Sequence, residues 1–562
     1  MRARIMLRWI AAAAMLVAAP VASSAKQAPA QFDWFEYSGS DGLPKPGPGE
    51  YANPILQGFY PDPSIVRVGE DYYLVNSTFS WFPGMPIFHS RDLVHWTQIG
   101  NAIDRSSQLD FGKLGMGQGL YAPDISFHDG TFYLINTCVG CGDTFVMTAR
   151  DPAGPWSDPI FLPDLAGAID PSIFFDEDGT AWIVNNGPPQ EKPRYEGHRA
   201  LWLQQFDAKP MKTVGSRRVL VDGGVHPEQN PIWIEGPHIF RKDGLYYLIA
   251  AEGGTAEQHS EVVFRSDKVT GPYVPLASNP ILTQRDLPND RVKPITSTGH
   301  ADFVETPNGE WWAVFLGVRP YDEAGNFNTG RETFMMPVRW EDGWPRITNP
   351  GELVPWEAPA AKLPRQPKGP VPLNGDFTLR EEFNSARLPP YWMMLRNPAG
   401  SWWRIGEGAL ELDPRPVGLG DDGNPSLVAR RQQHLNASAT TQLRFRPASD
   451  NAEAGLVAMQ SDEYYYFIGV GRHRGRAVVR VRQRAGDKQA TLAEAPLAGS
   501  SPVQLRISAR GPRYDFAWSP DGRHWRTLVR NADGTILSTK TAGGFVGAVF
   551  GLYAHDGGGD SQ

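Results

Sequence analysis

The sequence predicts an all-β fold: a five-bladed β-propeller followed by a β-sandwich. Three observations lead to this prediction. The 562 residues include 59 Gly and 50 Pro, which favour tight turns over long helices. A hairpin pattern recurs five times in the first part of the chain, which indicates repeated units of sheet. The last third contains short runs in which apolar and polar residues alternate, as in half-buried strands.

The first 25 residues, MRARIMLRWIAAAAMLVAAPVASSA, have the pattern of a secretory signal peptide. A basic start precedes an apolar stretch and the small residues Ser23 and Ala25. The apolar stretch is shorter than the roughly 20 residues that span a bilayer, which argues against a membrane anchor. We therefore predict cleavage after Ala25 and a secreted or periplasmic protein with no membrane partner.

The formal net charge of −8 argues against nucleic acid as a partner, because phosphate binding needs a basic surface. The cysteines of the chain are Cys138 and Cys141, in the sequence C-V-G-C. In an oxidising compartment they predict a small disulfide loop, and two thiols alone are too few for a four-ligand zinc site. A redox role is the weaker alternative, since the βαβ surroundings of a thioredoxin-like site are missing.

Residues 47–356 contain the repeated hairpin. The five copies are QGFYPDPSIVRVGEDYYLVNST, YAPDISFHDGTFYLINT, IDPSIFFDEDGTAWIVNN, EGPHIFRKDGLYYLIAAE and GHADFVETPNGEWWAVFLG. A weaker repeat fills the gaps between them, in HSRDLVHWTQI, TARDPAGPWSDPI and FRSDKVTGPYVPL. Four strands per repeat fit a propeller blade, and five copies predict five blades around a central channel. A large sandwich of hairpins is the alternative.

Polar residues recur at the start of these copies. The positions just before the aligned Pro63, Pro123, Pro171, Pro237 and Ala301 hold Asp62, Ala122, Asp170, Gly236 and His300, with Glu235 one residue further back. If each copy begins the innermost strand of a blade, these residues surround one end of the channel. Three carboxylates and an imidazole in one buried pocket are costly without a task, so the pattern predicts a functional site.

Two carboxylates beside one pocket are typical of glycoside hydrolysis, in which one is protonated and the other ionised. Glu235 follows Trp233 and Ile234, and this apolar setting favours a protonated carboxyl, so we predict that it is the acid. Asp62 is the predicted base, and Asp170 is predicted to raise the pKa of the acid and to orient it. A non-catalytic sugar-binding propeller is the alternative, but it would not need both carboxylates.

Several of these segments resemble glycoside hydrolase family 43, in particular its two-domain β-xylosidases and α-L-arabinofuranosidases. They are NPILQGFYPDPSIVRVGEDYYLVNSTFSWFPGMPIFHSRDLVHW, DPSIFFDEDG, IEGPHIFRKDGLYYLIAAEGGT and GRETFMMPVRWEDGWP. The resemblance covers about residues 53–345. It implies a five-bladed propeller, inversion of the anomeric configuration, and the roles of base, pKa modulator and acid for Asp62, Asp170 and Glu235.

The resemblance also implies substrate-binding residues. Phe79 and Trp81 in STFSWFPG match sugar-contacting aromatics, and Arg331 in GRET matches an arginine beside the base. The family often has tryptophan and histidine around YAPD, where this chain has Tyr121 and Asp124; we expect Tyr121 to contact the substrate.

A further residue carried by the resemblance is His300. The resemblance implies that His300 lies in the channel near a calcium ion or a water cluster. Water and Asp302 would satisfy its imidazole equally well. No cofactor is expected to be required for the reaction.

The chain changes character after Trp356. Residues 357–373 are rich in proline and predict a semi-rigid linker. Residues 374–562 alternate in the manner of a β-sandwich, and they resemble the concanavalin-like C-terminal domain of this branch of the family. In that branch a loop of the sandwich closes one side of the pocket. A separate carbohydrate-binding role is the alternative.

Residues 26–46 form an N-terminal segment that contains AQFDWFEYSG. Relatives with this sandwich usually finish with a strand resembling ADFDWFEY, so we expect residues 30–39 to supply that strand here. Phe32, Trp34 and Tyr37 would then face the core. A disordered tail is the alternative.

We therefore expect an inverting glycosidase that releases xylose from the non-reducing ends of xylo-oligosaccharides or xylan side chains. Action as an α-L-arabinofuranosidase on arabinoxylan or arabinan is the close alternative. The expected partner is a hemicellulose oligosaccharide or polysaccharide.

Overall fold

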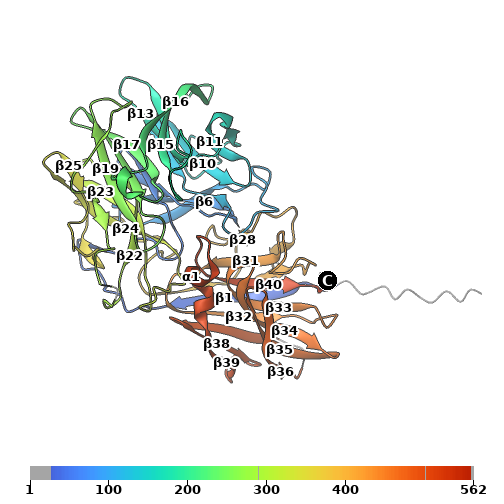
Figure 1. The fold of residues 1–562 in the computed structure, drawn as a ribbon. Coiled ribbons are helices and arrows are strands. Elements are labelled where there is room, and N and C mark those ends of the chain that lie inside the picture. The colour runs from blue at the N-terminus through green and yellow to red at the C-terminus, as the bar shows by residue number, and fades with distance from the viewer. Residues whose placement is uncertain (1–26, 289, 500–501, 559–562) are drawn as a thin grey trace, which may run out of the picture.

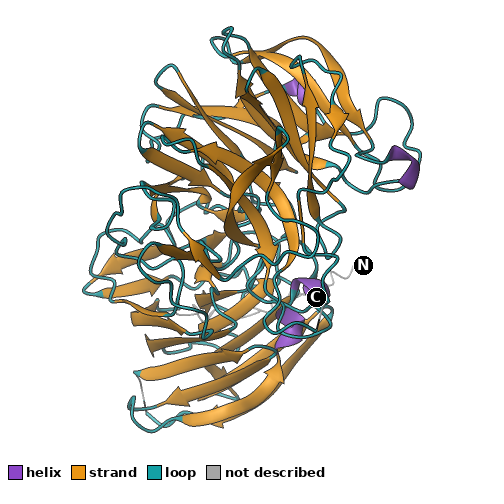
Figure 2. Ribbon diagram, turned by 90° about the vertical axis from the view of Figure 1, so that its left-hand side faces the viewer, coloured by secondary structure: helices purple, strands orange, loops and turns teal. Residues whose placement is uncertain are grey.

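The computed structural model describes residues 27–288, 290–499 and 502–558. The predicted signal peptide lies outside these residues. The chain forms two lobes, with the blades of a propeller in the upper part of Figure 1 and a sandwich of long strands below. Figure 2 shows that regular structure is almost entirely strand. Within the described ranges, no helix has the length and apolar character needed to cross a membrane.

Five antiparallel sheets form the propeller, and each runs outward from its first strand. The first blade contains β3 (Ser64–Val68), β4 (Asp71–Val75), β6 (Gly84–Ser90) and β7 (Thr97–Ile103). The second contains β9 (Asp124–His128), β10 (Thr131–Val139), β11 (Asp143–Ala149) and β12 (Ile160–Phe161), with β8 (Gly119–Leu120) beside β10. The third contains β13 (Ile169–Phe175), β14 (Ala181–Gly187), β15 (Ala200–Asp207) and β16 (Lys212–Asp222).

The fourth blade contains β17 (Glu235–Lys242), β18 (Leu245–Glu252), β19 (Ser260–Ser266), β20 (Val274–Pro275) and β21 (Leu282–Thr283). The fifth contains β22 (Thr296–Glu305), β23 (Trp311–Val318), β24 (Glu332–Glu341) and β25 (Trp344–Arg346). The first strands of successive blades contact one another, and β22 returns to contact β3. The ring therefore closes, and the prediction of a five-bladed propeller is confirmed.

Carboxylates join the inner strands across blade boundaries. Asp302 of the fifth blade accepts a hydrogen bond from the backbone N–H of Ile65 in the first, at 2.9 Å. Asp124 of the second blade accepts one from Ile173 in the third, at 3.0 Å. Because neighbouring sheets share few backbone hydrogen bonds, these buried side-chain bonds hold the inner strands in a defined arrangement around the channel.

The second domain packs two antiparallel sheets face to face. One has the order β29 (Trp403–Gly406), β30 (Ala409–Leu412), β1 (Ala30–Gly39), β32 (Asn436–Arg444), β37 (Val503–Arg510), β38 (Arg513–Ser519), β39 (Arg526–Asp533), with β27 (Phe377–Glu381) also paired to β1. The other has the order β31 (Ser426–Arg431), β40 (Val549–His555), β33 (Glu453–Ser461), β34 (Tyr464–His473), β35 (Arg476–Ala485), β36 (Lys488–Pro496). The predicted β-sandwich is thereby confirmed.

The N-terminal strand β1 lies inside the first of these sheets, in the place that the sequence analysis assigned to it. It pairs with β32 on one side and with β27 and β30 on the other. The expectation for its core face was wrong at one position. A bulge between Phe32 and Trp34 shifts the register, so Phe35 is buried and Trp34 lies beneath the guanidinium of Arg380.

The proline-rich segment 357–373 is packed rather than a free spacer. Its first residues form β26 (Glu357–Pro359), which pairs with β2 (Glu50–Ala52). Further on, Gln366 donates its N–H to Asp92 at 3.1 Å and accepts one from Arg91 at 2.8 Å, both in the first blade. The chain thus follows the propeller before it enters the sandwich.

The predicted disulfide between Cys138 and Cys141 is confirmed. Cys138 belongs to β10, and the bond closes the turn toward β11.

Candidate active site

A cavity of about 270 Å³ lies where the inner strands of the propeller begin. Seven of the residues predicted from the sequence line it: Asp62, Phe79, Tyr121, Asp170, Glu235, His300 and Arg331. The structure adds residues that the sequence analysis did not assign to the site, namely Trp233, Thr255 and Phe545. Trp233 had been recognised there only as an apolar neighbour of Glu235.

Many of the lining residues have a backbone conformation that L-amino acids rarely adopt. Asp62, Phe79, Asp170, Trp233 and His300 all have φ between 50° and 55°. Such conformations are strained and persist only where the surrounding structure holds them, which is why they gather at functional sites. The concentration of five of them around one cavity supports a functional role for it.

The side chain of Asp62 is buried, and its carboxylate contacts a cation and a hydroxyl group. Nη1 of Arg331 lies 3.0 Å from Oδ1 of Asp62, and Nη2 donates to Oδ2 at 3.3 Å. The hydroxyl of Ser77 also donates to Oδ2, at 2.5 Å. These contacts hold the carboxylate in one orientation at the cavity, where it can serve as a general base.

Glu235 has the opposite setting. It is the first residue of β17 and its side chain is buried. Burial, and next the negative charge of Asp170, raise the pKa of Glu235 well above its usual value. A carboxyl group that stays protonated at neutral pH is suited to donate a proton.

Asp170 interacts electrostatically with both of these groups. It accepts a hydrogen bond from the backbone N–H of Gly236 at 3.3 Å, directly after the acid. Burial, and next the charge of Asp62, raise the pKa of Asp170. Gly236 itself has φ of 55°, and a Cβ there would lie 2.7 Å from Nε2 of His300, so this position requires glycine.

Aromatic rings form one wall of the cavity, and the sandwich contributes one of them. Phe545 precedes β40 and stacks on Phe79, with ring centroids 5.5 Å apart. Tyr121 packs edge-on against both rings, at 5.5 and 5.7 Å. The guanidinium of Arg331 lies 5.5 Å from the ring of Phe545. In the sequence, Phe545 lies between glycine-rich segments, and this pattern does not identify it as a pocket residue. Its place at the cavity depends on how the two domains dock.

A second wall is built around Trp233. The guanidinium of Arg199 lies 4.9 Å from the indole ring, and its Nε donates to Asn186 at 2.8 Å. Asn186 in turn donates to the carbonyl of Ile234 at 2.5 Å. These contacts hold the backbone at Ile234, the residue directly before Glu235.

Trp81 does not line the cavity, contrary to the prediction. Its side chain is fully buried, in a cluster that includes Phe59, Met393 and Leu395. Trp81 and Phe82 form β5, which pairs with β28 (Met394–Leu395) of the second domain. Trp81 is therefore a packing residue of the domain interface. The STFSWFPG motif brings only Phe79 to the cavity.

His300 does line the cavity, but its neighbours do not fit a calcium ion. Its Nδ1 lies 3.8 Å from Oδ1 of Asp62, and the cation of Arg331 occupies the same carboxylate. Calcium takes six to eight oxygen ligands, and a guanidinium at this place would repel it. Burial lowers the pKa of His300 to about 4, so the ring is neutral at neutral pH.

A second group of ionisable residues lies in the channel. Nδ1 of His238 is 3.5 Å from both Asp124 and Asp302. Burial lowers the pKa of His238, but the charges of Asp302 and Asp124 outweigh it and raise the value to about 9. The ligand atoms are close enough together to hold a metal. In these three residues one imidazole faces two carboxylates, and we call them the ion triad.

The sequence model described as "Glycosyl hydrolases family 43" matches residues 51–345 of the chain. The chain belongs to glycosyl hydrolase family 43. A second model, "Beta xylosidase C-terminal Concanavalin A-like domain", matches residues 380–562. The resemblance noted in the sequence is thus confirmed, and family 43 membership makes the protein a glycosidase.

Related family 43 proteins match over almost the whole chain. A xylosidase/arabinosidase of Butyrivibrio fibrisolvens is 37% identical over 516 residues, which cover 90% of this chain and 96% of that protein. A non-reducing end α-L-arabinofuranosidase of Bacteroides ovatus is 36% identical, covering 90% and 91%. The crystal structure of a family 43 protein retrieved from a capybara gut metagenome has a TM-score of 0.87 and 38% identity, covering 94% and 100%.

Proposed function

We propose that this protein is an inverting glycosidase that releases xylose from the non-reducing ends of xylo-oligosaccharides or xylan side chains. One observation carries the proposal. A carboxylate paired with a guanidinium, Asp62, and a buried carboxyl with a raised pKa, Glu235, line the same cavity. This is the pair of groups that inverting hydrolysis uses.

The roles of the two groups follow from their surroundings. Asp62 accepts a proton from a water molecule, which attacks the anomeric carbon from the face opposite the leaving group. Glu235 donates its proton to the glycosidic oxygen as the bond to the anomeric carbon breaks. The proton thus passes in effect from acid to base, and exchange with solvent restores both groups. Asp170 keeps Glu235 protonated through its charge and fixes the following backbone at Gly236.

The shape of the cavity supports release of a single terminal sugar. Its volume is about 270 Å³, and Phe545 of the sandwich stands against Phe79 on one side. This placement favours a pocket closed by both domains over a sandwich that acts as a separate carbohydrate-binding module.

α-L-Arabinofuranosidase activity is the second candidate. The relatives named above include a xylosidase/arabinosidase and an α-L-arabinofuranosidase at similar identity. The two pentoses present similar hydroxyl arrangements, and both would meet the same aromatic wall.

We further propose that the reaction needs no metal ion. The carboxyl pair supplies both proton transfers, so no step of the reaction is left for a metal ion. The N-terminal sequence supports export to the periplasm or the medium, where hemicellulose fragments would be met.

Two measurements on the purified protein test the function. Hydrolysis of nitrophenyl β-xylopyranoside and nitrophenyl α-L-arabinofuranoside is compared side by side, and a higher kcat/KM for the xyloside is expected. Early-time NMR of nitrophenyl β-xylopyranoside hydrolysis, which releases a single sugar, should show α-xylose as the first sugar product. A β-anomer at early times would contradict the roles given to Asp62 and Glu235.

A further inference from the structure

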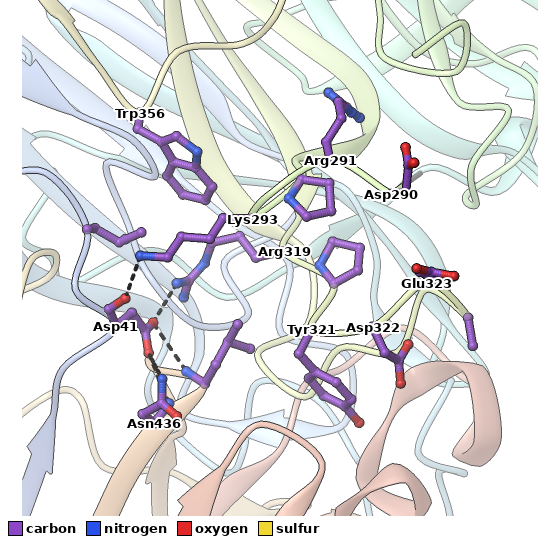
Figure 3. Close-up of a pocket in the computed structure, with 15 residues that line it drawn as sticks. Asp41, Asp290, Arg291, Lys293, Arg319, Tyr321, Asp322, Glu323, Trp356 and Asn436 are labelled. Carbon is purple, nitrogen blue, oxygen red and sulfur yellow. Dashed lines mark hydrogen bonds and ion pairs between the residues drawn. The ribbon is translucent and has the colours of Figure 1, made fainter. Parts of the chain in front are cut away.

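A buried charged residue, Asp41, joins the N-terminal segment to both domains. It follows β1 by two residues, and its carboxylate accepts hydrogen bonds from the backbone N–H groups of Leu435 and Asn436 in the sandwich, at 3.2 and 2.9 Å. The same carboxylate lies 2.6 Å from Nη1 of Arg319 in the propeller. Figure 3 shows these contacts at the edge of a cavity of about 790 Å³ between the domains.

Arg319 carries the contact further into the propeller. It directly follows β23, and its guanidinium binds Glu332 through two hydrogen bonds, Nε to Oε2 at 2.5 Å and Nη2 to Oε1 at 2.9 Å. Arg319 is 2% exposed and Glu332 is fully buried. Buried charges of this kind depend on one another, because loss of one partner leaves the others uncompensated.

Glu332 connects to the segments that carry Asp62 and Arg331. Its Oε1 accepts a hydrogen bond from the backbone N–H of Gly58 at 2.7 Å, four residues before Asp62. Its neighbour in the chain is Arg331, whose guanidinium holds Asp62 and whose carbonyl accepts the N–H of Tyr60 at 3.1 Å. The carboxylate of Glu332 therefore supports both the loop that carries the base, Asp62, and the start of the strand that follows Arg331.

We propose that Asp41 is a positioning residue for the catalytic base: through Arg319 and Glu332 it sets the geometry between Asp62 and Arg331. The proposal rests on the proposed function, in which Asp62 is the base. Asp41 touches neither the cavity around Asp62 nor the reacting atoms, so it acts only through the residues between them.

The sandwich supports the same loop by a second route. Nε of Arg431, in β31, donates to the carbonyl of Phe59 at 2.7 Å, and its guanidinium lies 4.1 Å from the ring of Tyr60. Gly58 has φ of 89°, and a Cβ there would lie 3.0 Å from Gln433. The loop that carries Asp62 is therefore pressed between the propeller and the sandwich, with Asp41 at one edge of the contact.

A matched pair of variants separates positioning from stability. Asp33 is in β1 itself and pairs with Arg444 of the sandwich at 3.0 Å, without a partner among the described propeller residues. Asp33→Asn thus removes a charged contact of the same strand away from the active site. Asp41→Asn removes the negative charge that faces Arg319. Both variants should lower the melting temperature.

The kinetic readouts should differ between them. At a temperature where circular dichroism shows both variants fully folded, Asp41→Asn should lower kcat for xylobiose about ten-fold, with KM within two-fold of the wild type. Asp33→Asn should leave both kcat and KM unchanged. Equal kinetics in the two variants would overturn the proposal.

Two further variants keep the result interpretable. Asp41→Glu keeps the buried charge but lengthens the side chain by one methylene, so it should fold even if Asp41→Asn does not. It should lower kcat by less than Asp41→Asn, again with little change in KM. Unchanged kinetics in Asp41→Glu, with Asp41→Asn unfolded, would also overturn the proposal. Asp62→Asn tests the base independently: if it retains wild-type hydrolysis, the proposed function fails first, and the positioning role fails with it.

Discussion

Nη1 of Arg331 lies 3.0 Å from Oδ1 of Asp62, although the two residues are 269 positions apart in the chain. The strand that follows Arg331 and the loop that carries Asp62 also exchange backbone hydrogen bonds, between Leu56 and Thr333 at 3.3 Å. The first and fifth blades thus close the ring at the point where the predicted base is held.

Replacing this arginine tests the contact. Arg331→Lys keeps the positive charge but loses the planar pair of donors, so kcat/KM should fall about 10- to 100-fold. Arg339→Lys is the matched control, because Arg339 is on the same blade and binds Glu352 at 2.7 Å on its outer part. The control should keep kcat/KM within two-fold. Similar losses in both variants would argue against a special role for Arg331.

The protonation of Glu235 depends partly on Asp170. Burial is the largest cause of its raised pKa, and the charge of Asp170 is the next. Asp170→Asn removes that charge, so the pKa of Glu235 should fall and the alkaline limb of kcat/KM should move to lower pH. Asp176→Asn, a buried carboxylate after β13, is the control. An unmoved limb in Asp170→Asn would contradict this coupling.

Removal of the acid should affect substrates unequally. Glu235→Ala should lower kcat on xylobiose by about 10² to 10⁴, because the leaving sugar needs a proton. The nitrophenyl xyloside should lose much less, since nitrophenolate leaves without one. Stopped assays on both substrates with the same enzyme preparation measure the difference. Equal losses would show that Glu235 is not the proton donor.

Phe545 is expected to contribute to substrate binding from the second domain. Phe545→Ala removes the ring that stacks on Phe79 and opens the cavity on that side, so KM for the nitrophenyl xyloside should rise about five- to ten-fold, a loss in the range of one aromatic contact. Trp525→Ala, which removes a ring beside Arg506 elsewhere on the sandwich, should leave KM unchanged. If Phe545→Ala and Trp525→Ala have the same KM, the sandwich does not complete the pocket.

Because of the ion triad in the channel, the stability of the protein should decrease at alkaline pH. The pKa of His238 rises from 6.5 to about 9 in the folded state. Its contribution to the free energy of unfolding is therefore complete below pH 6.5 and is lost as the pH rises through about 9. His238→Gln should cost about 3 kcal/mol at pH 6 and less at pH 10. Melting curves of the wild type and of His238→Gln across this pH range measure the cost, and His524→Gln, at an exposed histidine, is the control. A difference between wild type and His238→Gln that does not change with pH would contradict the raised pKa of His238.

Much of this protein follows from its sequence. Turn residues between aromatic and β-branched runs specify hairpins locally, and their five-fold recurrence specifies five blades. Because the same position recurs in every copy, Asp62, Asp170, Glu235 and His300 were expected at one end of a channel, and the structure brings them to one cavity. The strand at residues 30–39 was likewise readable from its alternating aromatics, except for the bulge that buries Phe35 in place of Trp34.

The remaining features depend on how distant surfaces meet. Phe545 lines the cavity and Trp81 does not, because docking of the sandwich carries one ring into the cavity and covers the other. The route from Asp41 to Glu332 likewise joins three segments that only packing of the two domains brings together. Local patterns encode strands, turns and repeats, since these depend on residues close in the chain. The faces that pack across domains, and the charges they bury, depend on shape and desolvation over the whole molecule, which only the tertiary structure determines.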